Sequence, residues 1–329
     1  ARPVSAPAPV AEMAAMHPPV RLGVRIAVLL ALAVLPALTG ALDQPFLLDL
    51  ALRIMILATA AVSLNLILGY GGMISFGHAA YIGIGAYAVG IPAYYGEYSG
   101  YVQLPLAIGA GALFALVTGY ICLRTKGVYF IMITLAFAQM AYFAFVSIEE
   151  YGGDDGLVIE QRSEFTGIID MESTHQFYYV VLVFLVGALY LVSRIVNARF
   201  GMAVQGAKDN DQRMQSLGFD TFRYRLACYV IAGAMAAAAG WLMGNYNYFF
   251  SPEMMGWTHS GELIFMVVLG GAGSLFGPLY GAIVLIILEE QLSSATVYWP
   301  LILGAILIAV VLFARGGLEG MLAKLERRK

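Results

Sequence analysis

The sequence predicts an all-α integral membrane protein with about ten transmembrane or re-entrant helical segments and two diverged glycine-rich repeats. Hydrophobic residues make up 60% of the 329 residues and charged residues only 12%, and the mean hydropathy is +0.79. These values are far more apolar than those of soluble domains. Apolar runs of about 20 residues separate the charged segments, which is the length that a helix needs to cross the hydrocarbon layer.

Eight apolar runs are expected to cross the membrane as single helices. In chain order they are residues 24–42, 46–68, 73–95, 104–123, 128–148, 177–195, 226–250 and 297–313. The stretch 262–288 is too long for one crossing, and residues that interrupt helices divide it (Gly270, Gly271, Gly273, Gly277 and Pro278). We expect a broken hairpin or a re-entrant pair there.

The basic residues indicate an orientation, because short cytoplasmic loops carry an excess of Lys and Arg. With the N-terminus inside, all of the 18 basic residues except Arg53 and Arg162 lie in segments that can face the cytoplasm. This arrangement requires residues 262–288 to enter and leave the membrane on the same side. Arg53 lies four residues after Asp49, so the two are expected to neutralise each other on one helix face.

The chain divides into three regions. Residues 1–20 are rich in Ala and Pro and are expected to be a mobile cytoplasmic tail, residues 21–316 form the transmembrane domain, and residues 317–329 form a basic cytoplasmic tail. Segment 149–172 is strongly acidic and is expected on the outer face, either as a solvated loop or as a contact for a partner. The cysteines, Cys122 and Cys228, lie near predicted helix ends, and we expect no disulfide, metal or cofactor.

Two segments share the pattern Gly-Gly-x-x-Ser, at residues 71–75 and 270–274. Many transporters contain two repeats whose broken helices meet near the membrane midplane, and exposed backbone there requires cover from protein or a watery cavity. Close helix packing explains the glycines equally well, as it does for Ala232, Ala236 and Gly240. The candidate substrate-pathway residues are Asn65, Gly71, Gly72, Ser75, Gly77, His78, Gly270, Gly271 and Ser274. His78 is alternatively an interhelical hydrogen-bonding residue.

The chain lacks a Gly-x-x-x-x-Gly-Lys-Ser/Thr phosphate loop and a series of intramembrane Asp, Glu and Lys residues. Energy for any transport must therefore come from another protein, or the transport is passive. The polar loop around residues 197–220 is expected to form a short amphipathic helix that stops near Gly218. This helix either docks onto a soluble ATPase or is a connector near anionic lipid.

These segments, together with residues 127–140 (GVYFIMITLAFAQM) and 151–157 (YGGDDGL), resemble the LivM-type permease subunits of branched-chain amino-acid ABC importers. The resemblance runs from about residue 50 to the last span. It implies a multi-pass protein of the bacterial inner membrane with both termini in the cytoplasm. It also implies a homologous second permease, cytoplasmic ABC ATPase subunits, a periplasmic or extracellular substrate-binding protein and surrounding membrane lipid as partners, with no nucleic acid.

The resemblance also assigns residues. Residues 197–222 of the permease domain match the ATPase-coupling loop, and the expected coupling residues are Gly201, Ala207, Lys208, Asp209, Asn210 and Gly218. The sequence Gly-Ala-Lys-Asp at 206–209 departs from the more usual Ala-Ile-Arg-Glu. The chain itself has no expected catalytic residue and is not an enzyme, because a separate subunit would hydrolyse ATP.

The cargo implied by the resemblance is branched-chain or related amino acids, with amides and aromatic acids used by similar permeases. The alternative function is an ion-coupled secondary carrier of small amphipathic solutes. A third hypothesis, a non-transporting membrane scaffold, leaves the paired Gly-Gly-x-x-Ser segments unexplained.

Overall fold

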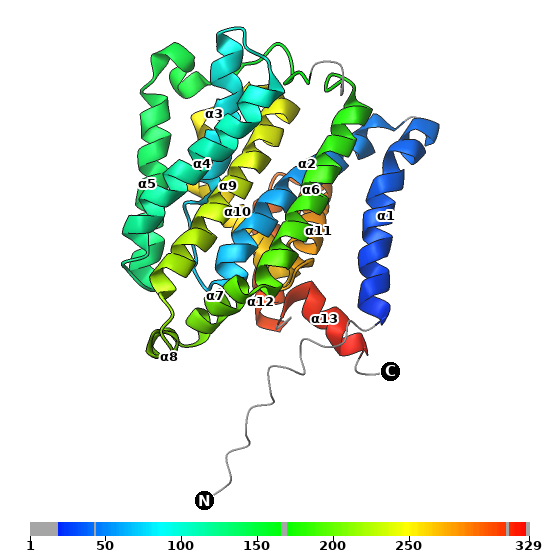
Figure 1. Ribbon diagram of the computed structural model, residues 1–329. Coiled ribbons are helices and arrows are strands. Elements are labelled where there is room, and N and C mark those ends of the chain that lie inside the picture. Colours follow the sequence, from blue (N-terminus) through cyan, green and yellow to red (C-terminus); the bar gives the residue numbers. More distant parts are fainter. Residues whose placement is uncertain (1–18, 43, 166–169, 314–315, 327–329) are drawn as a thin grey trace, which may run out of the picture.

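The computed structural model describes residues 19–42, 44–165, 170–313 and 316–326, and this part of the chain is helical apart from two short strands. The structure confirms the predicted all-α class (Figure 1). The α-helices are α1 (Pro19–Leu42), α2 (Pro45–Asn65), α3 (His78–Tyr94), α4 (Gly100–Cys122), α5 (Val128–Val146), α6 (Thr174–Asn197), α7 (Arg199–Asp209), α8 (Asp211–Ser216), α9 (Thr221–Asn247), α10 (Trp257–Gly270), α11 (Gly277–Ala295), α12 (Trp299–Phe313) and α13 (Gly317–Glu326).

The shorter elements are the π-helical turn η2 (Leu66–Tyr70), the 3-10 turns η3 (Glu149–Tyr151), η4 (Gly153–Asp155) and η5 (Pro252–Met255), and the antiparallel strands β1 (Leu157–Val158) and β2 (Phe249–Phe250). By length and composition, α1, α2 with η2, α4, α5, α6 and α9 are each able to cross a membrane. The remaining apolar helices α3, α10, α11 and α12 complete the bundle.

The centre of the bundle is α2, in which every residue from 58 to 65 is buried. Helices α6, α9, α10 and α11 pack around it, while α3 and α4 pack on α9. Small residues allow the closest approach: a methyl group on Gly240 of α9 would overlap the carbonyl group of Ile82 on α3. This contact confirms the predicted packing role of Gly240.

The predicted runs 24–42, 128–148 and 177–195 are confirmed as α1, α5 and α6, with small differences at their ends. Helix α9 begins at Thr221, earlier than the predicted residue 226, because the Asp220 carboxylate accepts a hydrogen bond from the Arg223 N–H and caps the helix. The helix ends before the predicted residue 250, since Tyr248 takes a left-handed conformation (φ 54°) and the next two residues form β2.

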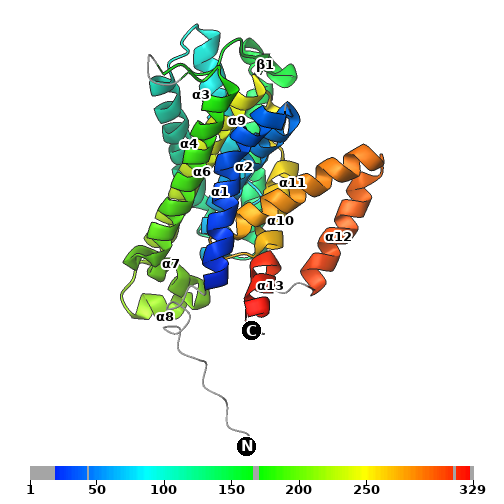
Figure 2. The ribbon, with the colours of Figure 1, turned by 90° about the vertical axis from the view of Figure 1, so that its right-hand side faces the viewer.

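The broken hairpin predicted at residues 262–288 is confirmed. Helix α10 ends at Gly270, the chain turns through residues 271–276, and α11 packs back against α10. Figure 2 shows the two helices diverging from this turn, with α12 descending beside them.

Four expectations differ from the structure. The predicted span 73–95 is wrong at its start, because residues 73–77 are not helical and α3 begins at His78. Arg53 does not pair with Asp49, since its guanidinium lies 3.1 Å from the Glu289 carboxylate on α11. The predicted tail 1–20 is wrong for residues 19 and 20, which begin α1, and its residues 1–18 lie outside the described residues. Much of the predicted basic tail 317–329 is the helix α13.

The bundle has two distinct ends. We call the end with Lys126, α7, α8 and α13 the basic end, and the opposite end with residues 149–165 the acidic end (Figures 1 and 2). At the acidic end, the buried Arg162 donates hydrogen bonds from Nε to the Asn245 carbonyl and from a terminal guanidinium nitrogen to the Met171 carbonyl, each 2.9 Å long. Its guanidinium also lies over the Phe177 ring, 4.4 Å from the centroid. Arg162 therefore ties the acidic loop to α6 and α9.

Candidate functional site

Break 1, defined as residues 71–77, is the non-helical segment that joins η2 to α3. Gly72 has a φ of +69°, a conformation that glycine adopts without strain. The chain then folds back, so that the Met73 N–H donates a 2.9 Å hydrogen bond to the Ile67 carbonyl. A β-carbon on Gly77 would lie 2.5 Å from the Thr134 carbonyl oxygen of α5. Glycine is therefore required both for the turn and for the close approach of α5.

Polar side chains from two neighbouring helices satisfy the backbone that break 1 exposes. The Phe76 N–H donates to Thr134 Oγ1 of α5 at 3.3 Å, and the Ala79 N–H donates to Ser260 Oγ of α10 at 2.9 Å. The first N–H groups of a helix have no partner within the helix, so these hydroxyls replace water at the start of α3. Break 1 is thus held between α5 and α10.

His78, the first residue of α3, is fully buried and forms a 2.8 Å hydrogen bond between Nε2 and Ser63 Oγ of α2. This contact fits the hydrogen-bonding interpretation of His78. The ring also meets the Tyr81 ring edge-on, with 5.5 Å between centroids.

Break 2, defined as residues 271–276, has the same character. Gly271 and Gly273 have φ values of +116° and +82°, which favour glycine. Ser274 Oγ donates a 2.7 Å hydrogen bond to the Gly271 carbonyl and closes the turn. The Gly-Gly-x-x-Ser patterns therefore both correspond to helix breaks, at the two positions that the sequence indicated.

Asn65 joins the two breaks. Its side chain is fully buried at the end of α2, just before the η2 turn that leads into break 1. Nδ2 donates to the Ser274 carbonyl at 2.8 Å, and Oδ1 accepts from the Gly273 N–H at 2.9 Å. Both functional groups of one amide thus bind the backbone of break 2. A side chain on Gly69 would overlap Gly273, so the segments also touch directly.

Lys208 connects break 1 to the basic end. This residue lies in the last turn of α7, and its Nζ donates a 2.7 Å hydrogen bond to the Gly69 carbonyl in η2. Its stem crosses Gly72, where a β-carbon would lie 2.8 Å from Lys208 Cγ. A cation is favourable at this helix C-terminus, because the unpaired carbonyls carry partial negative charge. Lys208 therefore bonds directly to η2 and packs against break 1.

Asp211 fixes the following helix, α8, against the bundle. Its carboxylate lies 2.6 Å from Lys126 Nζ and 3.8 Å from an Arg225 guanidinium nitrogen. Burial by itself raises the pKa of Asp211, but hydrogen bonds from Lys126 and Thr221 and the charge of Arg225 lower this pKa below its ordinary value. Asp211 is therefore ionised at neutral pH.

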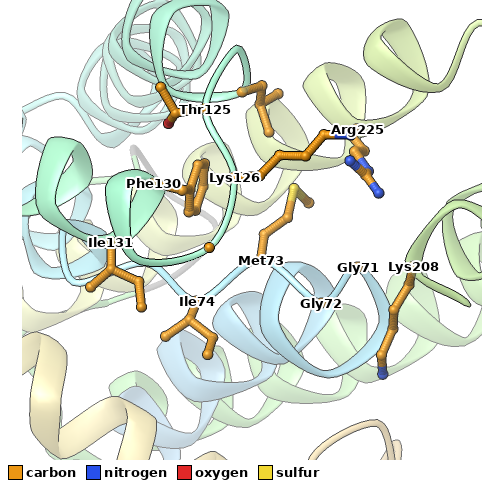
Figure 3. A pocket seen from close by; sticks show the side chains of 12 residues that line it. Gly71, Gly72, Met73, Ile74, Thr125, Lys126, Phe130, Ile131, Lys208 and Arg225 are labelled. Atoms are coloured by element: carbon orange, nitrogen blue, oxygen red, sulfur yellow. The ribbon is translucent and has the colours of Figure 1, made fainter. Parts of the chain in front are cut away.

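A cavity of about 210 Å³ lies beneath break 1 at the basic end. Figure 3 shows Met73 and Ile74 between Phe130 and Ile131 of α5 on one side and Lys208 on the other. Lys126 and Arg225 also line the cavity, so its polar lining is cationic. Among the described residues, no group of three or more His, Cys, Asp or Glu side chains could hold a metal ion.

The structure places the predicted pathway residues in two adjoining segments. Asn65, Gly71, Gly72, Ser75, Gly77 and His78 lie in or beside break 1, while Gly270, Gly271 and Ser274 lie in or beside break 2. Among the predicted coupling residues, Lys208 contacts break 1 and the buried Ala207 accepts a 2.8 Å hydrogen bond from Arg225.

The other predicted coupling residues have local roles. Gly201 allows the tight turn from α6 into α7, where a β-carbon would lie 2.5 Å from Val196 Cα. The Asn210 side chain caps α8 by accepting from the Arg213 N–H at 2.9 Å, which divides the expected single helix into α7 and α8. Gly218 ends α8 with a φ of +88°, and Asp209 is exposed.

Sequence reasoning missed the residues of other elements that support the region around the breaks or hold α7 and α8 at the basic end. They are Ser63, Gly69, Lys126, Thr134, Asp211, Arg225 and Ser260. A usable signal existed for Ser63 and Thr134, because each is a polar residue inside an apolar run.

Comparisons with known proteins give a consistent result. The family model described as "Branched-chain amino acid transport system / permease component" matches residues 46–311. The chain is 26% identical over 296 residues to the high-affinity branched-chain amino acid transport system permease protein LivM of Salmonella typhimurium, covering 83% of this chain and 70% of that protein. The corresponding LivM of Escherichia coli is 25% identical over the same shares.

A second group of relatives matches part of the chain. The permease protein LivH of Escherichia coli, from the high-affinity branched-chain amino acid transport system, is 34% identical over 126 residues, which is 37% of this chain and 40% of that protein. No solved structure matches the chain significantly.

Proposed function

The chain belongs to the family of branched-chain amino acid transport system permease components, and from this premise we propose that it is the membrane permease of an ATP-driven ABC importer. It is a multi-pass membrane transporter subunit and not an enzyme, and its likeness to both LivM and LivH implies a second permease subunit. We assign branched-chain or related amino acids as the cargo, with amides or aromatic acids as further members of the class. A separate ABC ATPase supplies the energy.

The substrate pathway runs along the two breaks. Broken helices expose backbone groups that are tolerated in a membrane only beside protein or a watery cavity. A cationic cavity of about 210 Å³ adjoins break 1, and Asn65 couples break 1 to break 2 by two hydrogen bonds. Residues 71–77 and 271–276 thus form a single unit that changes shape together during alternating access.

Energy enters at residues 197–222, the coupling loop of the permease domain that spans residues 21–316. The observation that carries this proposal is the 2.7 Å hydrogen bond from Lys208 Nζ to the Gly69 carbonyl. It is a direct link between a helix at the surface of the basic end and the start of break 1. An ATPase that moves α7 and α8 therefore moves break 1.

The basic end, where α1 begins and α13 ends, faces the cytoplasm, and the excess of Lys and Arg in cytoplasmic loops supports this orientation. The acidic end then faces the periplasm or the exterior, where a substrate-binding protein docks. The membrane is the bacterial inner membrane.

The first test is purification of the complex from native membranes. We expect a soluble ATPase to accompany the wild-type chain and to be lost when residues 208–211 are replaced by Gly and Ser. The matched control replaces Glu149 and Glu150 at the acidic end, which should leave the ATPase bound. Absence of any ATPase, combined with uptake that follows an ion gradient after ATP depletion, would support the ion-coupled carrier instead.

The second test separates docking from coupling. Lys208→Gln removes the charge and shortens the side chain, so the charge-assisted bond to the Gly69 carbonyl is lost. A hydrogen bond to a charged group contributes about 1.5–3 kcal/mol. We expect uptake into proteoliposomes to fall by about tenfold while the ATPase stays bound and hydrolyses ATP. Arg199→Gln removes the charge of an exposed side chain in the same helix. This variant is the control and should transport normally. Equal uptake by both variants would exclude Lys208 as the link.

A further inference from the structure

The helix α13 lies directly beneath break 2. Its entry glycines, Gly316 and Gly317, have φ values of +97° and +65° and lie against Gly271. A β-carbon on Gly271 would lie 2.6 Å from the Gly316 carbonyl oxygen, and one on Gly317 would lie 2.5 Å from the Gly271 nitrogen. Figure 2 shows α13 below α10, next to the lower end of α1. Break 2 therefore rests on the backbone of α13 without an intervening side chain.

An ion pair holds α13 in this position. The Arg25 guanidinium of α1 lies 2.6 Å from the Glu319 carboxylate of α13, across 294 residues of sequence. The two side chains are only 14% and 9% exposed. A buried charge whose partner is removed is strongly destabilising, so the two helices are expected to stay together only while both charges remain.

The same pair also touches break 2. The Arg25 guanidinium lies over the ring of Phe276, the last residue of break 2, at 5.1 Å from the centroid. On the other side, a β-carbon on Gly271 would lie 3.6 Å from Glu319 Cβ. Arg25 and Glu319 thus contact the two ends of break 2 while they bind each other.

The two breaks are therefore supported in parallel ways at the basic end. Break 1 rests on α7 through Lys208, and break 2 rests on α13 through the Arg25–Glu319 pair. Arg25 and Glu319 lie outside residues 46–311, the part of the chain that the family model matches. This second support thus lies in the segments that flank the matched range.

We propose that Arg25 and Glu319 are positioning residues that latch α13 beneath break 2, and that this latch must move when break 2 changes shape during transport. The second half of this statement rests on the proposed function, because it assumes that break 2 lines the substrate pathway. The first half is a property of the chain alone. Two measurements address the halves separately.

The first measurement follows the position of α13 in the full-length chain. Spin labels are attached at Met321→Cys of α13 and Leu30→Cys of α1, both exposed positions, in a chain whose Cys122 and Cys228 are replaced by alanine. We expect a narrow distance distribution that becomes longer and broader in Arg25→Gln and in Glu319→Gln.

The exchanged pair, Arg25→Glu with Glu319→Arg, should restore the narrow distribution of distances. If the two side chains acted only by filling space, the exchange would not restore it. Glu262→Gln, at an exposed His259–Glu262 pair, is the control and should leave the distribution unchanged. An unchanged distribution in Glu319→Gln overturns the latch. If the single variants do not accumulate, failure of the exchanged pair to restore both accumulation and distance overturns it equally.

The second measurement tests whether the latch must move. Arg25→Cys and Glu319→Cys are joined by a short bis-methanethiosulfonate cross-linker in the reconstituted transporter. We expect loss of uptake on cross-linking and recovery when a reductant removes the linker. Uptake that continues in the cross-linked protein overturns a moving latch. If the wild-type chain, reconstituted in the same way, shows no ATP-dependent uptake, the proposed function fails instead, while the distance measurement still decides the latch.

Discussion

Replacing Asn65 by alanine removes both hydrogen bonds that connect α2 to break 2. Each buried hydrogen bond contributes about 0.5–1.5 kcal/mol net, so the pair contributes about 1–3 kcal/mol. Interhelical polar contacts within membranes average about 0.6 kcal/mol, which places the lower limit near 1 kcal/mol. The Gly273 N–H and the Ser274 carbonyl would also lose their partner in a packed interior. We therefore expect a lower free energy of unfolding and impaired transport together.

The free energy of unfolding is measured by denaturant titration of the protein in mixed micelles, and transport by uptake into proteoliposomes. Asn197→Ala is the matched control, because its side chain makes only a local 2.8 Å bond to the Ser193 carbonyl at an exposed helix end. The control should change stability by less than about 0.5 kcal/mol. Equal stability of the two variants would refute the conclusion that Asn65 holds the breaks together.

Three further predictions follow from other parts of the bundle. Gly240→Ala places a methyl group against an α3 carbonyl, so thermal unfolding in detergent should show a loss of about 1–3 kcal/mol from overpacking. Asp211 has a lowered pKa in the folded protein, so its stabilising contribution is complete above its ordinary pKa of about 4 and disappears as the pH falls through the lower folded value. Stability measured against pH should therefore fall less steeply at acid pH in Asp211→Asn than in the wild type. Arg162→Lys keeps the charge but loses the fork that reaches two carbonyls, so hydrogen exchange in the acidic loop should accelerate and stability should fall by about 1–3 kcal/mol.

Each of these predictions has a control and a contradicting result. Gly109→Ala introduces a methyl group into open space and should not destabilise α4, so an equal loss in both glycine variants would contradict the close-packing argument. An identical acid dependence in Asp211→Asn and the wild type would contradict the ionised pair. Arg124→Lys, at an exposed arginine, should leave hydrogen exchange at the acidic end unchanged. If exchange there accelerated as much in Arg124→Lys as in Arg162→Lys, the Arg162 contacts would not be the cause.

The long helices were predictable from the sequence because an apolar run between polar flanks has one favourable location, the membrane. Residues 128–148 and 177–195 illustrate this, since α5 and α6 occupy nearly the same ranges. Hydropathy failed at residues 73–77, because an apolar segment that leaves the helical conformation has the same composition as one that continues it. The backbone conformation of Gly72, rather than polarity, ends the helix there.

The sequence predicted where the two segments of the candidate site lie, but not which side chains bind them. The repeated Gly-Gly-x-x-Ser pattern indicated both breaks, because glycine adopts without strain the positive φ values found at Gly72, Gly271 and Gly273. Their partners were not predictable, as Thr134 and Ser260 show, because each hydroxyl lies on a different helix from the N–H that it accepts from. A hydrogen bond between helices depends on their packing, which local sequence does not encode.

The amino-acid sequence was enough to show that this chain is a helical membrane protein, that its basic and acidic segments are separated, and which residues interrupt its helices. Composition and local spacing suffice for these properties, because they depend on the transfer of segments between water and hydrocarbon. The long-range contacts came from the folded structure: Asn65 binds break 2 across 209 residues, Lys208 reaches η2 across 139 residues, and Arg25 pairs with Glu319 across 294 residues. Such contacts form only after the helices have packed, because packing brings distant side chains within hydrogen-bonding distance.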